Sequence, residues 1–486
     1  MLEKLEPENV FYFFEEICKI PHGSGNTKQI SDYLKSFAEE RKLYCRQDEW
    51  NNIIIIKEAS KGYEHHEPVI LQGHMDMVAV QNADSPLNMT AEGLLLQVDG
   101  DNIYAKGTSL GGDDGIAVAF GLALLDGTAY AHPRIELIIT VDEEVGMDGA
   151  RNIMLEEITA KRMINLDQEE EGVFIAGCAG GARVDIKKEM MCCLSKGVLC
   201  KLEVMGLQGG HSGAEIDKER GNAICLLARL LTQLLNDYEI SLLNMQGGVA
   251  DNAIPTQAMA EFLLRTPDSD LYRIQKEVAE KLEKAFVQVK TEYLQKDGQL
   301  DFHFQMAGKQ SCADACSTED SAKWILLLNA LPHGVISYSR KMKGLVETSL
   351  NPGILTLQDG KAQISISVRS SVESAKYALI QQLKSIGSLA ETDVTVRGDY
   401  PGWDYATDSK LRNKMVEIYR QMYGKVPEIE AIHAGLECGI FQSKLPGLDC
   451  VSIGPDMKNI HTTKETLSIS SVERTWNYLL KVLENL

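Results

Sequence analysis

Short apolar runs alternate with amphipathic helix patterns over roughly the first 185 residues. Residues 9–20 and 27–40 carry apolar side chains at helical spacing, whereas 68–74, 134–144 and 162–170 are short apolar runs that end in polar residues. Runs of this length are typical of buried strands, and the helix-type periodicity lies between them. The alternation predicts an α/β fold.

The pattern changes between residues 186 and 395. A strand, a helix, two strands and a second helix follow one another, and a similar order recurs from about residue 300. After residue 403 the helix-then-strand alternation returns. We therefore predict one domain formed by 1–185 and 396–486, with an internally duplicated α+β domain, 186–395, inserted into it.

Composition and charge narrow the class of protein. The formal net charge is -21 and the pI is near 5.0, so the chain repels nucleic-acid phosphates and anionic lipid. No apolar stretch approaches the roughly 20 residues that span a bilayer, and the first residues have no basic and apolar leader pattern. Eleven scattered cysteines are typical of reduced thiols. We expect a cytoplasmic protein with small-molecule or peptide partners, and neither nucleic acid nor membrane.

Ionisable side chains follow several of the predicted strands. In open α/β sheets, ligands bind at the carboxyl ends of the strands. The residues at these ends and in a glycine-rich turn before a helix are His74, Asp76, Asp113, Asp114, Asp142, Glu143, Glu144, Asp167 and His461. Taken singly, the histidine could be a hydrogen-bonded strand end and the aspartates could be helix caps.

The cluster taken together favours a metal site. Gathering several carboxylates in one pocket costs kilocalories per buried charge unless they are protonated or coordinate cations. Two divalent cations would neutralise them. Mixed histidine and carboxylate ligands suit zinc or a similar ion, whereas an all-oxygen set would favour magnesium or calcium.

Ordered motifs over nearly the whole chain resemble those of the co-catalytic zinc metallopeptidases related to aminoacylase and carboxypeptidase G. The motifs are GHMDMV, GGDDGIAVA, DEEVGMDGA, NLDQEE, GGHSG and HTTKE. The long duplicated insert, with GCAGG, DNAIP, IHAGLECG and SIGP, is most similar to the cytosolic Xaa-His dipeptidases, also called aminoacyl-histidine dipeptidases. The resemblance implies a di-zinc aminopeptidase-like catalytic domain, formed by 1–185 and 396–486, with 186–395 as its lid.

The resemblance also implies the ligands of two zinc ions. His74 and Asp167 would bind one ion, Glu144 and His461 the other, and Asp113 would bridge them. Co²⁺ or Mn²⁺ could substitute for Zn²⁺. Asp76 would hold the imidazole of His74 in the correct tautomer. In the related proteins the peptide bond after the bridging aspartate is cis, so we expect this between Asp113 and Asp114.

Further roles follow from the same resemblance. Glu143 would be the general base, and His211 of the lid would donate a hydrogen bond to the oxyanion after lid closure. The substrate would contact Asn252, Arg369, Gly435 and Glu437. His433 could have a direct role or could only shape its loop.

These inferences predict a zinc-dependent dipeptidase. Water activated by two metal ions would hydrolyse unblocked dipeptides, including Xaa-His and carnosine-type substrates, and the protein could form a homodimer. The alternative enzyme is an amide hydrolase that acts on N-acyl amino acids or other short peptides. A catalytically silent peptide-binding protein on this fold is the alternative outside enzymes.

Overall fold

The computed structural model describes residue 2, residues 4–267 and residues 271–486. Contacts within the chain divide it into two compact units. The first unit comprises 1–178, 405–431 and 436–486, and the second comprises 179–404 and 432–435. Within the described ranges, every helix is too short or too polar to cross a membrane.

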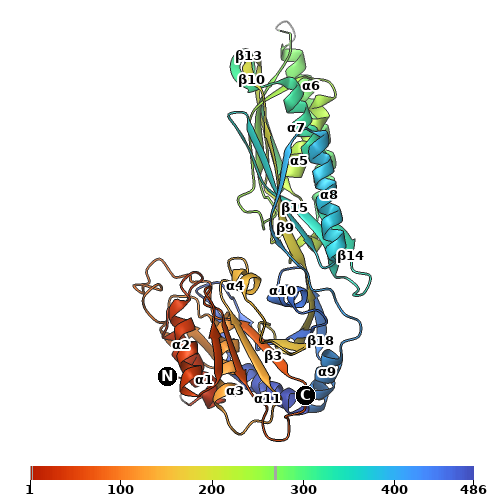
Figure 1. Ribbon diagram of the computed structural model, residues 1–486. Coiled ribbons are helices and arrows are strands. Elements are labelled where there is room, and N and C mark those ends of the chain that lie inside the picture. Colours follow the sequence, from red (N-terminus) through yellow and green to blue (C-terminus); the bar gives the residue numbers. More distant parts are fainter. Residues whose placement is uncertain (1, 3, 268–270) are drawn as a thin grey trace. The chain divides into compact units, whose positions relative to one another are not determined.

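The first unit is built on an eight-stranded mixed sheet (Figure 1). In spatial order its strands are β1 (Tyr44–Gln47), β2 (Ile53–Lys57), β6 (Ile135–Thr140), β3 (Val69–His74), β7 (Arg162–Asn165), β19 (Asp449–Ser452), β8 (Val173–Cys178) and β18 (Glu428–Ile432). β3 runs parallel to both β6 and β7, and β19 runs parallel to β7. β3 and β6 are buried along their whole length, as strands inside a parallel sheet covered on both faces are.

Helices pack around this sheet, and apolar side chains of several of them share a core with its strands. They are α1 (Glu8–Cys18), α2 (Lys28–Glu40), α3 (Gly112–Asp126), α4 (Asp148–Asn152), α9 (Lys410–Tyr423), α10 (Glu437–Lys444) and α11 (Ile469–Asn485). α1, α3 and α11 share one apolar core with alternate residues of the strands, such as Val69 and Leu71. A small sheet of β20 (Met457–Lys458), β21 (Thr466–Ser468), β5 (Asn102–Ala105) and β4 (Leu96–Asp99) completes the unit.

The second unit contains a nine-stranded sheet with helices packed against it (Figure 1). Its main path is β13 (Asp301–Cys316), β10 (Cys192–Met205), β12 (Ala258–Leu264), β11 (Ile240–Gly247), β15 (Val346–Gln358), β16 (Lys361–Ser370), β9 (Gly180–Glu189) and β17 (Asp393–Tyr400), and β14 (Gly334–Tyr338) pairs with β15. The helices are α5 (Ala223–Leu235), α6 (Leu271–Tyr293), α7 (Thr318–Ala330) and α8 (Glu373–Leu389), together with the 3₁₀ helix η1 (Ile216–Lys218).

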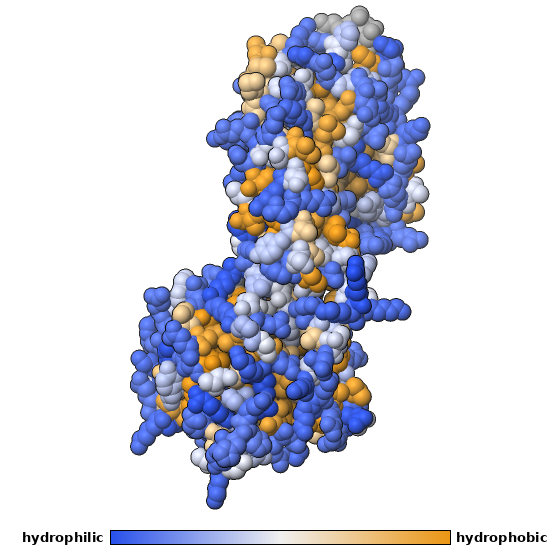
Figure 2. Space-filling model, turned by 45° about the vertical axis from the view of Figure 1, so that its right-hand side comes forward, coloured by the Kyte–Doolittle hydropathy of each residue, from blue (hydrophilic) through white to orange (hydrophobic). Residues whose placement is uncertain are grey.

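The element order of the second unit repeats approximately. Two strands separate α5 from α6, and three separate α7 from α8 because the short β14 is added. The unit begins at residue 179 and its main segment ends at 404, compared with the 186 and 395 expected from the sequence. The boundaries differ because β9 and β17 pair with each other in the second sheet, so both strands belong entirely to the second unit. Hydrophilic residues cover most of the face shown in Figure 2, with smaller apolar patches among them.

Candidate metal centre and active site

The adjacent strands β6, β3 and β7 end at the same edge of the first sheet. His74 is the last residue of β3, Glu143 and Glu144 follow the end of β6, and Asp167 follows β7. Because these strands are parallel, the side chains after their carboxyl ends come together. This edge is therefore where the expected cluster forms.

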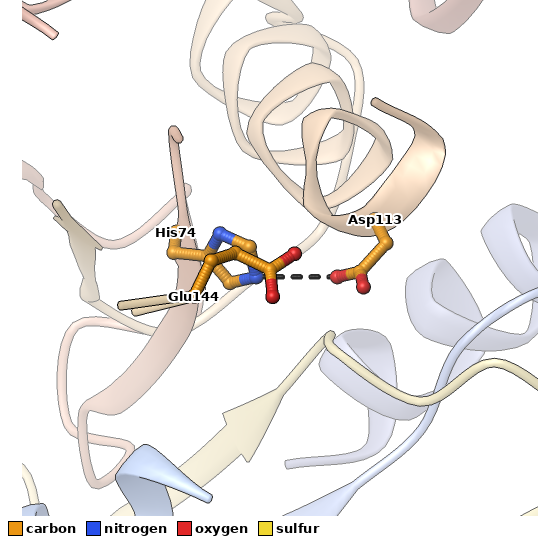
Figure 3. A group of neighbouring side chains, drawn as sticks. All are labelled: His74, Asp113 and Glu144. Carbon is orange, nitrogen blue, oxygen red and sulfur yellow. Dashed lines mark hydrogen bonds and ion pairs between the residues drawn. The ribbon is translucent and has the colours of Figure 1, made fainter. Parts of the chain in front are cut away.

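Asp113, at the start of α3, lies between two histidines. Its Oδ1 lies 3.2 Å from Nε2 of His74, and its Oδ2 lies 3.1 Å from Nε2 of His461. Nε2 of His461 is also 2.8 Å from Oε1 of Glu144, and Nε2 of His74 is 3.6 Å from Oδ1 of Asp167. Figure 3 shows His74 and Glu144 facing Asp113. The two oxygens of Asp113 thus face two different imidazoles, and each imidazole has a second carboxylate beside it.

The cluster is rich in negative charge and largely buried. Burial raises the pKa of Asp167 to about 7, despite hydrogen bonding to His74. Burial acts the same way on Asp113, but hydrogen bonds to His461 and His74 hold its pKa well below the usual range. Hydrogen bonds to Asp113 and Glu144 raise the pKa of His461 to about 10. The carboxylates outnumber the imidazoles, so the site favours additional positive charge.

The donor atoms fit divalent cations. Ligand atoms of His74, Asp113 and Glu144 lie within 4.8 Å of one another, as do those of His74, Asp114 and Asp167. Oδ1 of Asp114 is buried and lacks a hydrogen-bond partner among the described residues, while Oδ2 accepts from the backbone N–H of His74 at 3.1 Å. The peptide bond between Asp113 and Asp114 is cis, which confirms the expectation for this turn. Mixed imidazole and carboxylate donors suit zinc and similar ions.

Asp76 connects the cluster to the neighbouring loops. Nδ1 of His74 lies 3.0 Å from the backbone carbonyl of Asp76 and 3.4 Å from its Oδ1. The same Oδ1 accepts a hydrogen bond from the backbone N–H of Glu143 at 3.1 Å, and Oδ2 accepts from Oγ of Ser24 at 2.8 Å. Asp76 therefore holds the backbone at Glu143 as well as lying behind His74.

In the second unit, two segments bring His211 and Asn252 together. His211 forms a β-bridge with Ala253, and the N–H of Ser212 donates to the carbonyl of Asn252 at 2.8 Å. Nδ1 of His211 accepts backbone N–H bonds from Gly213 at 3.3 Å and Ala214 at 3.0 Å. Since Nδ1 is the acceptor, a neutral His211 carries its proton on Nε2.

Burial, together with nearby cationic side chains of the second unit, keeps His211 neutral. Burial, and then the positive charges of Arg369 and Arg183, lower the pKa of His211. Arg369 lies near the end of β16 and is 5% exposed, and its Nη1 donates to the hydroxyl of Tyr400 at 3.2 Å. Nε of Arg369 is buried and lacks a partner within the described part of the chain.

His433 and Gly435 belong to the short 432–435 segment of the second unit. Nε2 of His433 lies 2.7 Å from Oγ of Ser349. Burial and the nearby charge of Arg369 lower the pKa of His433 to about 3. A Cβ added to Gly213 would lie 2.6 Å from the carbonyl of His433 and 3.0 Å from Nε of Arg369, so these groups are packed closely together.

Comparisons with known proteins identify the family. Residues 70–485 match the description peptidase family M20/M25/M40. The chain belongs to this family. It is 35% identical to the cytosol non-specific dipeptidase of Escherichia coli (strain K12), with 100% of this chain and 99% of that protein covered.

Solved structures agree with this assignment to the M20/M25/M40 family. The aminoacylhistidine dipeptidase of Vibrio alginolyticus superimposes with a TM-score of 0.91 at 33% identity, covering 100% of this chain and 98% of that one. The aminopeptidase PepT of Bacillus cereus superimposes with a TM-score of 0.57 at 15% identity, over 99% and 98% of the two chains. The second likeness shows the fold alone. These comparisons confirm the resemblance inferred from the ordered motifs.

Glu437 lies in a buried hydrogen-bond network at the carboxyl ends of the strands. It begins α10 and is 1% exposed, and its Oε2 accepts hydrogen bonds from Nε2 of Gln72 at 2.5 Å and Oγ1 of Thr140 at 2.6 Å. Oε1 of Gln72 in turn accepts from Asn165 at 2.7 Å. This network connects the ends of β3, β6 and β7 through Oε2 of Glu437, whereas its Oε1 is buried and lacks a hydrogen-bond partner among the described residues.

Sequence reasoning missed the residues that support the cluster from behind. Gln72 and Thr140 lie outside the motifs, and each reads as one polar position in an apolar strand. Asn165 opens the NLDQEE motif, but only Asp167 of that motif received a role. Glu465 closes the HTTKE motif, but only His461 of that motif received a role. The place of Glu465 in the HTTKE motif was the sequence signal that could have identified it.

Proposed function

We propose that this chain is a metal-dependent dipeptidase that hydrolyses unblocked dipeptides, Xaa-His and carnosine-type substrates among them. Its membership of the M20/M25/M40 family and the activities for which two full-length relatives are named support a dipeptidase. One relative is described as non-specific and the other as an aminoacylhistidine dipeptidase. The choice between broad and Xaa-His specificity is therefore made by experiment. The name of the Escherichia coli relative also supports a cytosolic location.

The placement of Asp113 is the observation on which this proposal mainly rests. One oxygen faces His74 and the other faces His461. In our proposal His74 and Asp167 would hold one zinc ion and Glu144 and His461 would hold the other, and both ions would share Asp113. The ions would supply Lewis acidity, polarising the scissile carbonyl and lowering the pKa of water.

Glu143 is proposed as the general base. It would take the proton of the attacking water and pass it to the leaving amine, a role that needs a carboxylate beside the reacting atoms. Its backbone N–H is held by Asp76, the residue that also contacts His74. Because Asp76 contacts both residues, it would fix the position of Glu143 relative to His74.

His211 is proposed as the donor to the oxyanion of the tetrahedral intermediate. The two backbone N–H groups on its Nδ1 leave the Nε2–H as the group that can donate. The lowered pKa keeps the imidazole neutral at pH 7, so this tautomer persists. Because these two hydrogen bonds fix the ring, the imidazole is already oriented before substrate binds.

The residues proposed to bind the substrate are Asn252, Arg369, Gly435 and Glu437. A guanidinium can place two parallel hydrogen bonds on a carboxylate, and Nε of Arg369 is available for one of them. A free C-terminal carboxylate would satisfy this buried charge. The alternative, an amide hydrolase acting on N-acyl amino acids, uses the same metal chemistry and the same carboxylate recognition but needs no free amine.

The deciding experiment is a substrate panel with zinc-loaded protein. It compares carnosine, alanyl-histidine, dipeptides without histidine, and N-acetyl amino acids by kcat/KM, with chelator-treated protein as the control. Hydrolysis of unblocked dipeptides that is lost with the metal and restored by zinc, cobalt or manganese supports the proposal. Preference for N-acetyl amino acids would support the alternative, and metal-independent or absent turnover would refute both.

A further inference from the structure

Glu465 accepts three backbone hydrogen bonds from the loop that leads into Asp113. Its Oε2 receives the N–H groups of Leu110 at 2.8 Å and Gly111 at 3.2 Å, and its Oε1 receives that of Gly112 at 2.8 Å. The side chain is 3% exposed, so these bonds form away from water. Both carboxylate oxygens are committed to one short segment of backbone.

This carboxylate supplies acceptors for the loop just before the regular part of α3. Leu110 and Gly111 precede the helix, Gly112 is its first residue, and Asp113 and Asp114 have non-helical backbone angles. Buried backbone N–H groups need acceptors, and Gly111 and Gly112 have no side chain that could supply one. Asp113 is close in sequence, but its oxygens face His74 and His461. An acceptor from a distant segment leaves Asp113 free for those contacts.

Glu465 also lies four residues after His461, in the loop between β20 and β21. Its own N–H donates to the carbonyl of Thr462 at 3.2 Å, which folds the loop back on itself. One side chain therefore connects the loop carrying His461 with the loop carrying Asp113. The pairing of β21 with β5 brings the two segments near each other across more than 300 positions of sequence. Glu465 adds a direct connection between the two loops.

We propose that Glu465 is a positioning residue that holds the Asp113 and His461 loops in their metal-binding arrangement before any ion binds. This inference rests on the proposed function, because it assumes that these two residues are metal ligands. A ligand pair arranged in advance loses less conformational freedom on binding, so the ions bind more tightly. Residues that support metal ligands from behind commonly contribute 10- to 100-fold in affinity.

Glu465→Gln tests this with little change in shape. The amide keeps one acceptor oxygen, but its NH₂ group faces a backbone N–H and cannot accept from it. Metal affinity, measured by chelator competition, should fall about 10-fold or more. At saturating metal, kcat should return to within about threefold of wild type, because ligands and base remain.

Glu136→Gln is the matched control. Glu136 is also fully buried in the first unit, and it accepts backbone bonds from Thr159 at 3.0 and 3.1 Å and from Ala160 at 3.0 Å. It lies at the start of β6, the opposite end from Glu143. Both substitutions should lower the melting temperature of the metal-free protein, but only Glu465→Gln should weaken metal binding.

Hydrogen exchange on the wild-type protein supplies a test that needs no variant. The amides of residues 110–112 should already be protected in metal-free protein, because Glu465 holds them. Fast exchange there would overturn the inference even if Glu465→Gln failed to fold. If the wild-type protein binds metal and hydrolyses dipeptides, unchanged metal affinity in a folded Glu465→Gln protein would also overturn the inference. Wild-type protein that neither binds metal nor hydrolyses dipeptides would instead overturn the proposed function.

Discussion

Two substitutions of His211 should separate the roles of its two ring nitrogens. In His211→Asn, the amide oxygen can take the place of Nδ1 and accept from Gly213 and Ala214, but nothing replaces the Nε2–H. In His211→Gln, the amide nitrogen can reach the place of Nε2, but the backbone acceptor is lost. Removing one oxyanion donor costs about 10²- to 10³-fold in kcat, or roughly 3 to 4 kcal/mol. His211→Asn should show this full loss with its loop intact.

The Gln variant should retain more kcat than the Asn variant, since it keeps a donor, but with looser placement. Steady-state kinetics on an unblocked dipeptide give kcat and KM, and metal analysis should show unchanged metal content because His211 is outside the first unit. His303→Gln is the control, because His303 lies exposed on β13 of the same unit. Equal activity of the Asn variant and wild type would refute the oxyanion role. Greater damage in the Gln than in the Asn variant would assign the function to loop support instead.

Three further substitutions test other parts of the proposal. Glu143→Ala should keep its metal and lose about 10²- to 10⁴-fold in turnover; loss of metal in proportion to activity would make Glu143 a ligand instead. Arg369→Met should lower kcat/KM for a dipeptide about 10- to 100-fold, the usual contribution of charged hydrogen bonds. The enzyme should also lose its preference for the dipeptide over the matching C-terminal amide. An unchanged ratio of kcat/KM for acid and amide would exclude Arg369 from the substrate site. Burial lowers the pKa of His433 to about 3 in the folded protein, compared with about 6.5 in the unfolded chain. Between these values only the unfolded chain binds a proton at His433. As the pH falls below 6.5, the free energy of unfolding of wild type should therefore decrease by up to about 1.4 kcal/mol per pH unit. Urea unfolding at pH 7 and 5.5 should show a shallower loss in His433→Asn, and equal losses would contradict the burial argument.

Much of the architecture is readable from the sequence because it depends on local periodicity. The short apolar runs at Val69 and Ile135 have the length and burial of parallel strands, and β3 and β6 form there. The polar residues that follow them must then lie at one sheet edge, since parallel strands end together. That rule allowed His74, Glu144 and Asp167 to be grouped without coordinates, and the ordered motifs added His461 and the family.

Tertiary structure alone decided the relations between residues that are far apart in sequence. No periodicity predicts that Glu465 reaches the N–H groups of residues 110–112, or that Gln72 and Thr140 occupy an oxygen of Glu437. The tautomer of His211 likewise depends on which two N–H groups the folded loop turns toward Nδ1. Hydrogen bonds are short and directional, so a motif names the residues that can form them and only packing selects the partners.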